Sequence, residues 1–296
     1  MRLSLDPSAP VLLALDIDDT CSYQETVDGV RTLGVVAPPV QEAIERVRAA
    51  GVHVVFATGR QTDSALSMAR QQGWGDLDML CSQGAVTVHT SSDASDFEVT
   101  ARRTFDARPA LAALLARFPD ISYSVEHADT GHAVGVAHPH GTVFGRMIAG
   151  MTDEDAAATT ALMVSSTSAR GRELHEVIEH LGLSCHPFTD LGSGWVDVSP
   201  PGVTKASGLE ELRLRYGVPR ANTVAVGDAA NDLPMFAWAA HSVAMGQASR
   251  AVRDEATHVT GTLADDGVVA VLDAVVEALA PTPTFTPTFT PTPAPR

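Results

Sequence analysis

The chain has 296 residues, of which 45% are hydrophobic and 19% are charged, so it has the composition of a globular protein with a sizeable core. Its formal net charge of −16 repels nucleic acids and anionic lipid, and we expect neither as a partner. The same charge would repel a phosphorylated ligand, so a phosphate site needs its own local positive charge.

The N-terminal segment, the apolar runs and the cysteines do not indicate a membrane or secreted protein. Residues 1–10 carry one arginine and no apolar segment, which does not resemble a signal peptide, and no run approaches the ~18 apolar residues of a membrane helix. The three cysteines, Cys21, Cys81 and Cys185, are far apart and form no CxxC pair. We therefore expect a cytoplasmic protein with isolated thiols.

The first part of the chain alternates strands and helices. A short apolar run at 11–15 suits a buried parallel strand, and Pro39 then opens a helix that stops at Gly51. A second apolar run covers 52–57, a helical stretch covers 62 to about 73, and a third strand covers 77–81. This alternation predicts a parallel sheet covered on both faces.

The same alternation returns late in the chain. A helix capped by Thr204 ends at Gly217, and strands at 223–226 and 242–245 flank a helix at 231–240. A closing helix covers 266–280. The predicted fold class is α/β, with a Rossmann-like doubly wound parallel sheet as the core. The polar clusters of the chain lie at the carboxyl ends of these strands, where such sheets bind ligands.

The middle of the chain mixes short strands (85–90, 121–125, 132–137, 162–165) with helices near 107–118 and 172–181. We expect an inserted α+β domain at 85–194 that lies as a lid over a catalytic core made of 1–84 and 195–280. Residues 281–296, a TPTF repeat rich in proline and threonine, predict a disordered tail, with a docking peptide or spacer as the alternative.

The first polar cluster follows the first strand. Asp16 and Asp18 are separated by one residue, and carboxylates this close need a counter-charge, for which Mg²⁺ with its oxygen ligands is suited. Asp16 suits the attack on phosphorus, and Asp18 suits protonation of the leaving oxygen and later activation of water. The alternative is an acidic turn in which Asp19 or Thr20 caps a helix.

Two further clusters could bind a phosphate. Thr58-Gly59-Arg60 ends a strand, and its hydroxyl and backbone N–H groups can surround a phosphate, although an ordinary strand-to-helix turn is the alternative. Lys205 lies at a helix start, where the helix dipole does not favour a cation, so it is placed to meet an anion. A solvated surface lysine is the alternative.

The fourth cluster is Gly227-Asp228-Ala229-Ala230-Asn231-Asp232. Asp228 ends a strand and can be a further oxygen ligand for the metal, while Asn231 and Asp232 lie near the first turn of the next helix. Capping of that helix by Asn231 or Asp232 is the alternative, and both roles are compatible.

In this order the four clusters resemble the haloacid dehalogenase superfamily of phosphatases, closest to its Cof-type branch of sugar-phosphate phosphatases, over residues 11–280. The matching positions are Asp16, Asp18 and Thr20; Thr58, Gly59 and Arg60; Lys205; and Gly227, Asp228, Asn231 and Asp232. The insertion resembles the C2-type cap of the family, which excludes water and selects the substrate.

The resemblance implies a role for each of these residues. Asp16 becomes a phospho-aspartate, and Mg²⁺ is held by Asp16, the backbone carbonyl of Asp18 and the carboxylate of Asp228. The phosphoryl group is bound by Thr58, Gly59, Lys205 and Asn231. Thr20, Arg60 and Asp232 support the site, Asp232 through Lys205 or the metal shell. These roles agree with a reaction that mostly needs positioning and charge neutralisation.

Some positions depart from the family pattern: Asp19, Cys21, Gln83 before Gly84, and Gln247. In the insertion, His127, His132, His138 and His140 lie close in sequence, but their spacing matches no standard zinc pattern. We expect Trp195 to pack rather than to stack on a ligand.

The sequence thus predicts a magnesium-dependent phosphomonoester hydrolase that acts on a small phosphorylated metabolite such as a sugar phosphate. A phosphomutase-like phosphotransferase and a non-enzymatic phospholigand-binding regulator are the alternatives. The presence of both Asp16 and Asp18 disfavours the regulator, which needs no acid or base. The substrate and the oligomeric state are not encoded in a readable motif.

Overall fold

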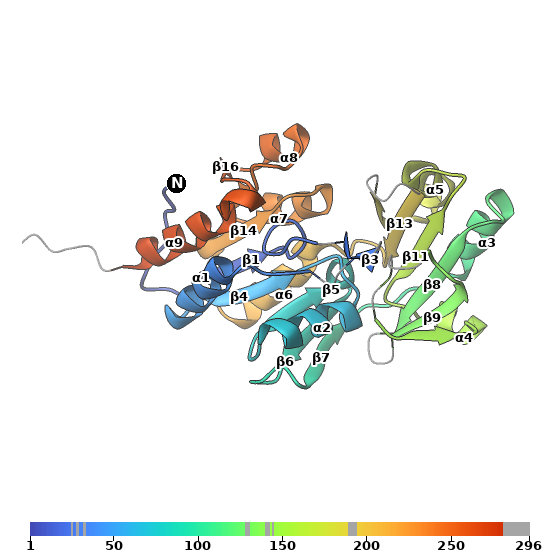
Figure 1. The fold of residues 1–296 in the computed structure, drawn as a ribbon, viewed down its shortest axis with the longest axis horizontal. Helices are drawn as coiled ribbons and strands as arrows, with labels where there is room; N and C mark the ends of the chain where they lie inside the picture. The colour runs from blue at the N-terminus through green and yellow to red at the C-terminus, as the bar shows by residue number, and fades with distance from the viewer. Residues whose placement is uncertain are drawn as a thin grey trace, which may run out of the picture.

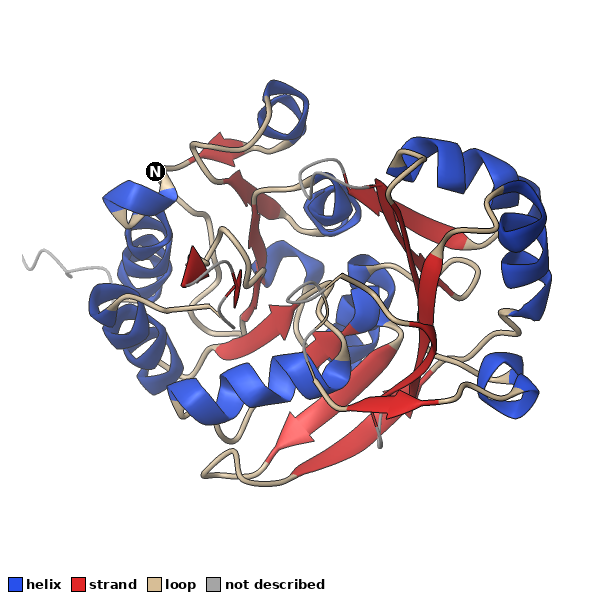
Figure 2. Ribbon diagram, turned by 45° about the vertical axis from the view of Figure 1, so that its right-hand side comes forward, coloured by secondary structure: helices blue, strands red, loops and turns tan. Residues whose placement is uncertain are grey.

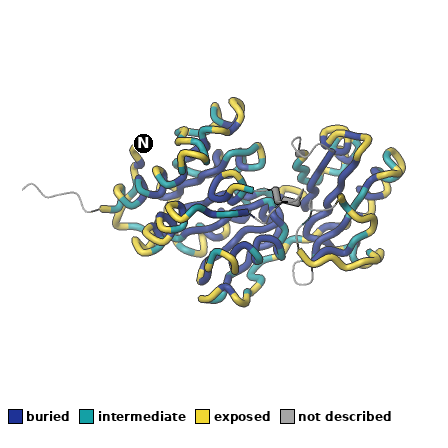
Figure 3. Tube along the Cα trace, viewed as in Figure 1, coloured by how far each residue is buried: buried dark blue, intermediate teal, exposed yellow. Residues whose placement is uncertain are grey.

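The computed structural model describes residues 1–24, 26–27, 30–31, 34–127, 131–139, 143, 145–188 and 194–280. These residues form two units, each built on its own sheet (Figure 1). Buried residues concentrate in the strands of both units, and exposed residues lie at the periphery (Figure 3). None of the helices in this part of the chain has the length and apolar character needed to cross a bilayer.

The first unit contains an eight-stranded sheet with the order β16-β15-β14-β1-β4-β5-β6-β7. The strands from β16 to β5 are parallel, and β6 and β7 add antiparallel pairs at one edge. The strands are β1 (Leu12–Leu15), β4 (His53–Ala57), β5 (Asp78–Cys81), β6 (Val86–Thr90), β7 (Phe97–Arg102), β14 (Thr223–Gly227), β15 (His241–Ala244) and β16 (His258–Val259).

Helices cover both faces of this sheet, as the doubly wound pattern predicts. Side chains alternate between the faces of a strand, so Leu13 and Leu15 of β1 join one apolar core while Leu12 and Ala14 join the other. The first core is closed by α1 (Pro38–Ala49), α2 (Thr62–Gln72) and α9 (Gly267–Leu279). The second is closed by α6 (Lys205–Arg215), α7 (Leu233–Trp238) and α8 (Arg250–Glu255). Burial on both faces explains why these strands are continuously apolar.

The second unit contains a six-stranded sheet with the order β10-β9-β8-β11-β13-β12. Its strands are β8 (Ser122–His127), β9 (Gly131–Val136), β10 (Met147–Ala149), β11 (Leu162–Ser166), β12 (Ser184–Phe188) and β13 (Gly194–Ser199). The helices α3 (Arg108–Arg117), α4 (Asp153–Ala157) and α5 (Gly171–Ile178) lie on the side away from the first unit (Figure 2). The opposite face of the sheet is therefore turned toward the first unit.

Shorter elements complete the described chain. A two-stranded sheet, β2 (Thr26–Val27) and β3 (Val30–Arg31), lies between the two units in Figure 1. The 3₁₀ helices are η1 (Ser82–Gly84), η2 (Glu179–Leu181), η3 (Arg220–Asn222), η4 (Ala230–Asp232) and η5 (Leu263–Asp265).

The two sheets do not divide the chain at residues 84 and 194, the domain boundaries expected from the sequence. Strands β6 and β7 pair within the eight-stranded sheet, and β13 belongs to the six-stranded one. Phe105 and Val198 pack in the core of the second unit, whereas Val203 packs in the first. An alternating strand pattern does not state which sheet the strand will join. We therefore propose a core of 1–102 and 200–280 and a cap of 103–199. The tail at 281–296 lies outside the described residues.

Candidate active site

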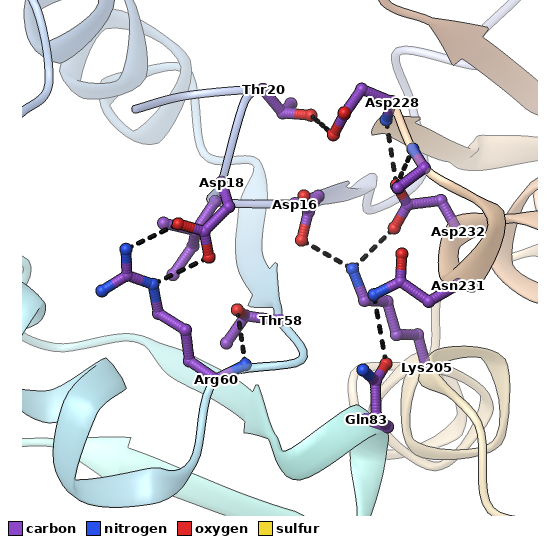
Figure 4. A network of polar contacts seen from close by, with 12 residues as sticks. Asp16, Asp18, Thr20, Thr58, Arg60, Gln83, Lys205, Asp228, Asn231 and Asp232 are labelled. Atoms are coloured by element: carbon purple, nitrogen blue, oxygen red, sulfur yellow. Dashed lines mark hydrogen bonds and ion pairs between the residues drawn. The ribbon is translucent and has the colours of Figure 1, made fainter. Parts of the chain in front are cut away.

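Three of the predicted residues each follow a strand of the parallel sheet directly. Asp16 follows β1, Thr58 follows β4 and Asp228 follows β14, and these strands are neighbours in the order β14-β1-β4. Because parallel strands end at one edge of the sheet, their next residues meet there. Lys205, the first residue of α6, reaches the same place (Figure 4). The sheet thus brings together residues that are up to 212 positions apart, from Asp16 to Asp228.

The ammonium group of Lys205 lies between two carboxylates. Its Nζ donates to Oδ1 of Asp16 and to Oδ1 of Asp232, each at 2.6 Å, and the side chain is fully buried. Burial alone acts against a charged amine, but the charges of Asp16 and Asp232 raise the pKa of Lys205 on balance. Lys205 therefore carries a fixed positive charge inside an acidic protein, which is the local charge that a phosphate site requires.

Asp232 organises the loop that carries Asp228. Its Oδ2 accepts hydrogen bonds from the backbone N–H groups of Asp228 and Ala229, both at 2.9 Å. A Cβ on Gly227 would lie 2.4 Å from the Cγ of Asp232, so glycine is required there for this side chain to fit. Asp232 thus joins Lys205 to the Asp228 loop.

Three carboxylates gather beside Lys205. Oxygen atoms of Asp16, Asp228 and Asp232 lie within 4.8 Å of one another, and Thr20 donates to Asp228 at 3.2 Å. Burial raises the pKa of Asp16 well above its usual value, and burial followed by the charge of Asp232 raises the pKa of Asp228 to about 7. One lysine cannot neutralise three carboxylates, so this donor set fits a divalent cation with oxygen ligands, such as Mg²⁺.

Within this group, Asp16 and Asp228 are the carboxylates that best fit a metal. Both oxygens of Asp232 are already used, one by Lys205 and the other by backbone N–H groups. The sequence placed Asp18 in the metal set through its backbone carbonyl, and the group of three carboxylates does not include the Asp18 side chain.

The carboxylate of Asp18 is directed to Arg60 instead (Figure 4). Its Oδ1 lies 2.6 Å from Nη2 of Arg60, its Oδ2 lies 2.8 Å from Nε, and Gln24 donates to Oδ1 at 2.8 Å. Although burial raises the pKa of Asp18, the hydrogen bonds and charge of Arg60 and then the bond from Gln24 lower it on balance. In this arrangement Asp18 is an ionised carboxylate, ready to accept a proton.

Three of the predicted phosphate-binding residues, Thr58, Gly59 and Asn231, lie near one another. Thr58 is fully buried, and its Oγ1 accepts from the N–H of Arg60 at 3.0 Å. Asn231 donates through Nδ2 to Oε1 of Gln83 at 3.3 Å. Gly59 lies against the same glutamine, since a Cβ on it would be 2.4 Å from Nε2 of Gln83. Gln83 is a site residue that the sequence did not assign, and its only signal was its departure from the family pattern.

Comparison with known proteins gives the family of this chain. A family model described as haloacid dehalogenase-like hydrolase matches residues 13–272. The chain belongs to this family. Its similarity to solved structures includes BT1666 from Bacteroides thetaiotaomicron, with a TM-score of 0.71 and 24% identity, covering 90% of this chain and 95% of that one. At this identity the likeness shows the shared fold.

Two curated relatives match shorter segments of this haloacid dehalogenase-like hydrolase. A phosphoglycolate phosphatase of Nitrosopumilus maritimus is 40% identical over 76 residues, which cover 26% of this chain and 33% of the relative. The 5-amino-6-(5-phospho-D-ribitylamino)uracil phosphatase YbjI of Escherichia coli is 36% identical over 106 residues, which cover 36% and 38%. The matches thus span little more than a third of these relatives.

The cap of this haloacid dehalogenase-like hydrolase presents a polar face to the core. Ser124 and Ser165 lie on the face opposite the apolar cap core, and their hydroxyls hydrogen bond to Nε2 and Nδ1 of His138 at 3.0 and 2.9 Å. The His138 ring lies 5.0 Å from that of Trp195. Burial, and then the charge of Lys205, lower the pKa of His186 in β12 to about 4.

Among the described residues, the other cap histidines form no group that could hold a metal. His127 pairs with Asp155 at 3.1 Å, His132 is buried in β9, and His140 lies outside the described residues. Within the described ranges, the carboxylates beside Lys205 form the one group that could hold a metal. Trp195 is 5% exposed and donates through Nε1 to Asp197 at 2.7 Å, which accords with a packing role.

Proposed function

We propose that this protein is a magnesium-dependent phosphomonoester hydrolase that acts through a phospho-aspartate on Asp16. The observation that carries this proposal is the position of Lys205, whose Nζ lies 2.6 Å from the Asp16 carboxylate beside a group of acidic side chains. A buried ammonium next to a nucleophilic oxygen can neutralise the equatorial oxygens of a phosphoryl group while that group is attacked.

The residues divide the reaction between them. An Asp16 oxygen attacks phosphorus, the bond from phosphorus to the ester oxygen breaks, and the leaving oxygen takes a proton from Asp18. Asp18, now ionised, accepts a proton from water as that water attacks the phosphorus of the aspartyl phosphate, which regenerates Asp16 and releases phosphate. Lys205, Thr58 and Asn231 orient the phosphoryl oxygens throughout. Bound Mg²⁺ would neutralise charge at the phosphoryl group, held by Asp16 and Asp228.

The ion pair with Arg60 suits only one of the two proton-transfer roles of Asp18. The paired carboxylate is ionised and suited to the second step, in which it accepts a proton from water. Donation in the first step requires a protonated Asp18, so this carboxyl has to leave Arg60 when substrate binds.

For the substrate, we propose a small phosphate monoester, such as a sugar phosphate. The names of the two relatives denote phosphatases of phosphoglycolate and of a phosphorylated ribityl compound, both small esters. The imidazole of His138, held on the polar cap face by Ser124 and Ser165, can contact the hydroxyl groups of such a leaving group.

The test is a screen of the purified protein against a panel of phosphorylated metabolites, with released phosphate as the readout. The panel contains phosphoglycolate, pentose and hexose phosphates, and sugar-alcohol phosphates, each with Mg²⁺ and with excess chelator. We expect phosphate to be released in the presence of Mg²⁺ and water, without an acceptor sugar. Release only when an acceptor sugar is present would favour the phosphomutase-like reaction, and phosphate binding without any turnover would favour the regulator.

A further inference from the structure

The turn that carries Gln83 has an unusual backbone. Ser82, Gln83 and Gly84 have φ values of 51°, 61° and 98°, all in the left-handed region. Glycine adopts this region freely, but serine and glutamine do so at a cost of about 1 kcal/mol or more each. A strained turn of this kind persists only where the surrounding structure holds it, and it is often found where a side chain has to be aimed.

The core unit holds the turn through the segment Thr58-Gly59-Arg60. The N–H of Ser82 donates to the carbonyl of Arg60 at 2.7 Å, and the N–H of Gln83 donates to the carbonyl of Thr58 at 3.2 Å. Gly84 packs against the backbone just before Lys205, where a Cβ would lie 2.4 Å from the carbonyl oxygen of Thr204. The turn is thus bound to both segments that carry phosphate-binding residues.

The cap unit holds the same turn through Glu126 of β8. This carboxylate is 1% exposed and accepts from the hydroxyl of Ser82 at 2.5 Å and from the N–H of Thr62 at 2.7 Å, both in the core unit. Thr160 of the cap donates to it at 2.8 Å. Contacts from two units therefore hold the turn that carries Gln83.

That side chain has one polar atom in use and one free. Gln83 is 1% exposed, and its Oε1 accepts from Asn231. Its Nε2 is buried and has no hydrogen-bond partner among the residues that the structure describes. A buried N–H left without an acceptor costs about 1–3 kcal/mol. Nε2 lies against Gly59, next to Thr58, so the free donor is located among the residues of the proposed phosphate site.

We propose that Gln83 is a further substrate-binding residue, whose Nε2 donates a hydrogen bond to an oxygen of the bound phosphate ester. This inference rests on the proposed function, because it takes the phosphoryl group to lie between Thr58, Asn231 and Lys205. The bond from Asn231 fixes Oε1, so the donor side of the amide faces the ligand. A neutral amide in this position adds a directed donor to the charge of Lys205.

The test is calorimetric titration of inorganic phosphate into the Mg²⁺-loaded protein. Gln83→Met keeps the length of the side chain and removes the N–H, and we expect it to raise the Kd for phosphate about tenfold. Gln83→Glu places a negative charge against the ligand and should raise the Kd at least about a hundredfold at pH 8. The matched control is Gln71→Met on the exposed surface of α2, which should leave the Kd unchanged.

The outcomes separate this inference from the proposed function. If the wild-type protein does not bind phosphate, the proposed function fails and the inference fails with it. If the wild-type protein binds phosphate and folded Gln83→Met binds it equally well, only the inference is overturned. A spectrum of the ¹⁵N-labelled wild-type protein needs no variant: the side-chain NH₂ signals of Gln83 must shift on phosphate addition, and unmoved signals would overturn the inference.

Discussion

Replacement of Asp16 by asparagine tests the nucleophile and the charge balance of the site together. The carboxylate lies 2.6 Å from the ammonium of Lys205 and within 4.8 Å of the carboxylates of Asp228 and Asp232. At an effective dielectric constant of about 20, the attraction is about 6 kcal/mol, and each repulsion is at least about 3.5 kcal/mol, or about 7 kcal/mol for the two. The attraction lost and the repulsion relieved therefore nearly cancel.

We accordingly expect Asp16→Asn to change the free energy of unfolding by less than about 2 kcal/mol, while it abolishes turnover. An amide oxygen is a poor nucleophile, so kcat should fall by at least about 10⁴-fold. The assays are urea unfolding without metal and phosphate release from the best substrate of the panel with Mg²⁺. Mass spectrometry of the variant shows whether any asparagine has reverted to aspartate by deamidation.

The matched control is Asp273→Asn, which removes a charge of the same kind from an exposed ion pair with Arg46. It should leave kcat unchanged and alter the free energy of unfolding by no more than about 1 kcal/mol. A kcat within tenfold of wild type for Asp16→Asn would refute the nucleophile. A loss of more than about 4 kcal/mol in unfolding free energy would refute the charge balance.

Three more perturbations test other parts of the structure. Glu126→Gln weakens the charge-assisted bonds from Thr62 and Ser82, so the free energy of unfolding should fall by about 2 kcal/mol in urea titrations. The control Glu98→Gln, at an exposed position, should have no effect. Equal stability of the two variants would contradict the contact between units. Burial raises the pKa of Asp197 from 3.8 to about 7, so its folded form keeps a proton that the unfolded form loses, and stability falls by up to about 4 kcal/mol as pH rises from about 4 to 7. Asp197→Asn should therefore stabilise the protein more at pH 8 than at pH 5, and an equal gain at both pH values would exclude a buried protonated carboxyl. Excess chelator should abolish phosphate release and lower Tm, and added Mg²⁺ should restore both; activity that persists in chelator would remove the metal from the proposal.

Much of the core could be predicted because its signals are local. A continuous apolar run followed by a polar residue marks both a strand and its end, and parallel strands bring such ends together by geometry alone. Asp16, Thr58 and Asp228 could thus be placed near one another from sequence, and the structure puts each directly after its strand. The lysine at the start of α6 could be recognised because a cation there needs an anion.

Other parts of the site depend on contacts that no local pattern encodes. The pairing of Asp18 with Arg60 is a choice of side-chain conformation across 42 residues. The sequence places the strand at 85–90 in the cap, whereas β6 joins the core sheet, because alternation reports a half-buried surface and not the sheet to which the strand belongs. Gln83 could be noticed only as a departure from the family pattern, since its proposed role depends on a left-handed backbone that the sequence does not predict.

The contact at Glu126 links the position of the cap to the phosphate site. Two of its donors, Thr62 and Ser82, belong to the core, and Thr160 belongs to the cap. If the cap lifts away, water replaces these partners at modest cost, but the strained Ser82–Gly84 turn loses the hydroxyl bond that helps to hold it. The remaining bonds of the turn then lie within the core alone, with Arg60 and Thr58 at its backbone and Asn231 at the Gln83 side chain. Cap closure therefore adds the Glu126 bond to a turn that the core already positions, at the stage when water is excluded.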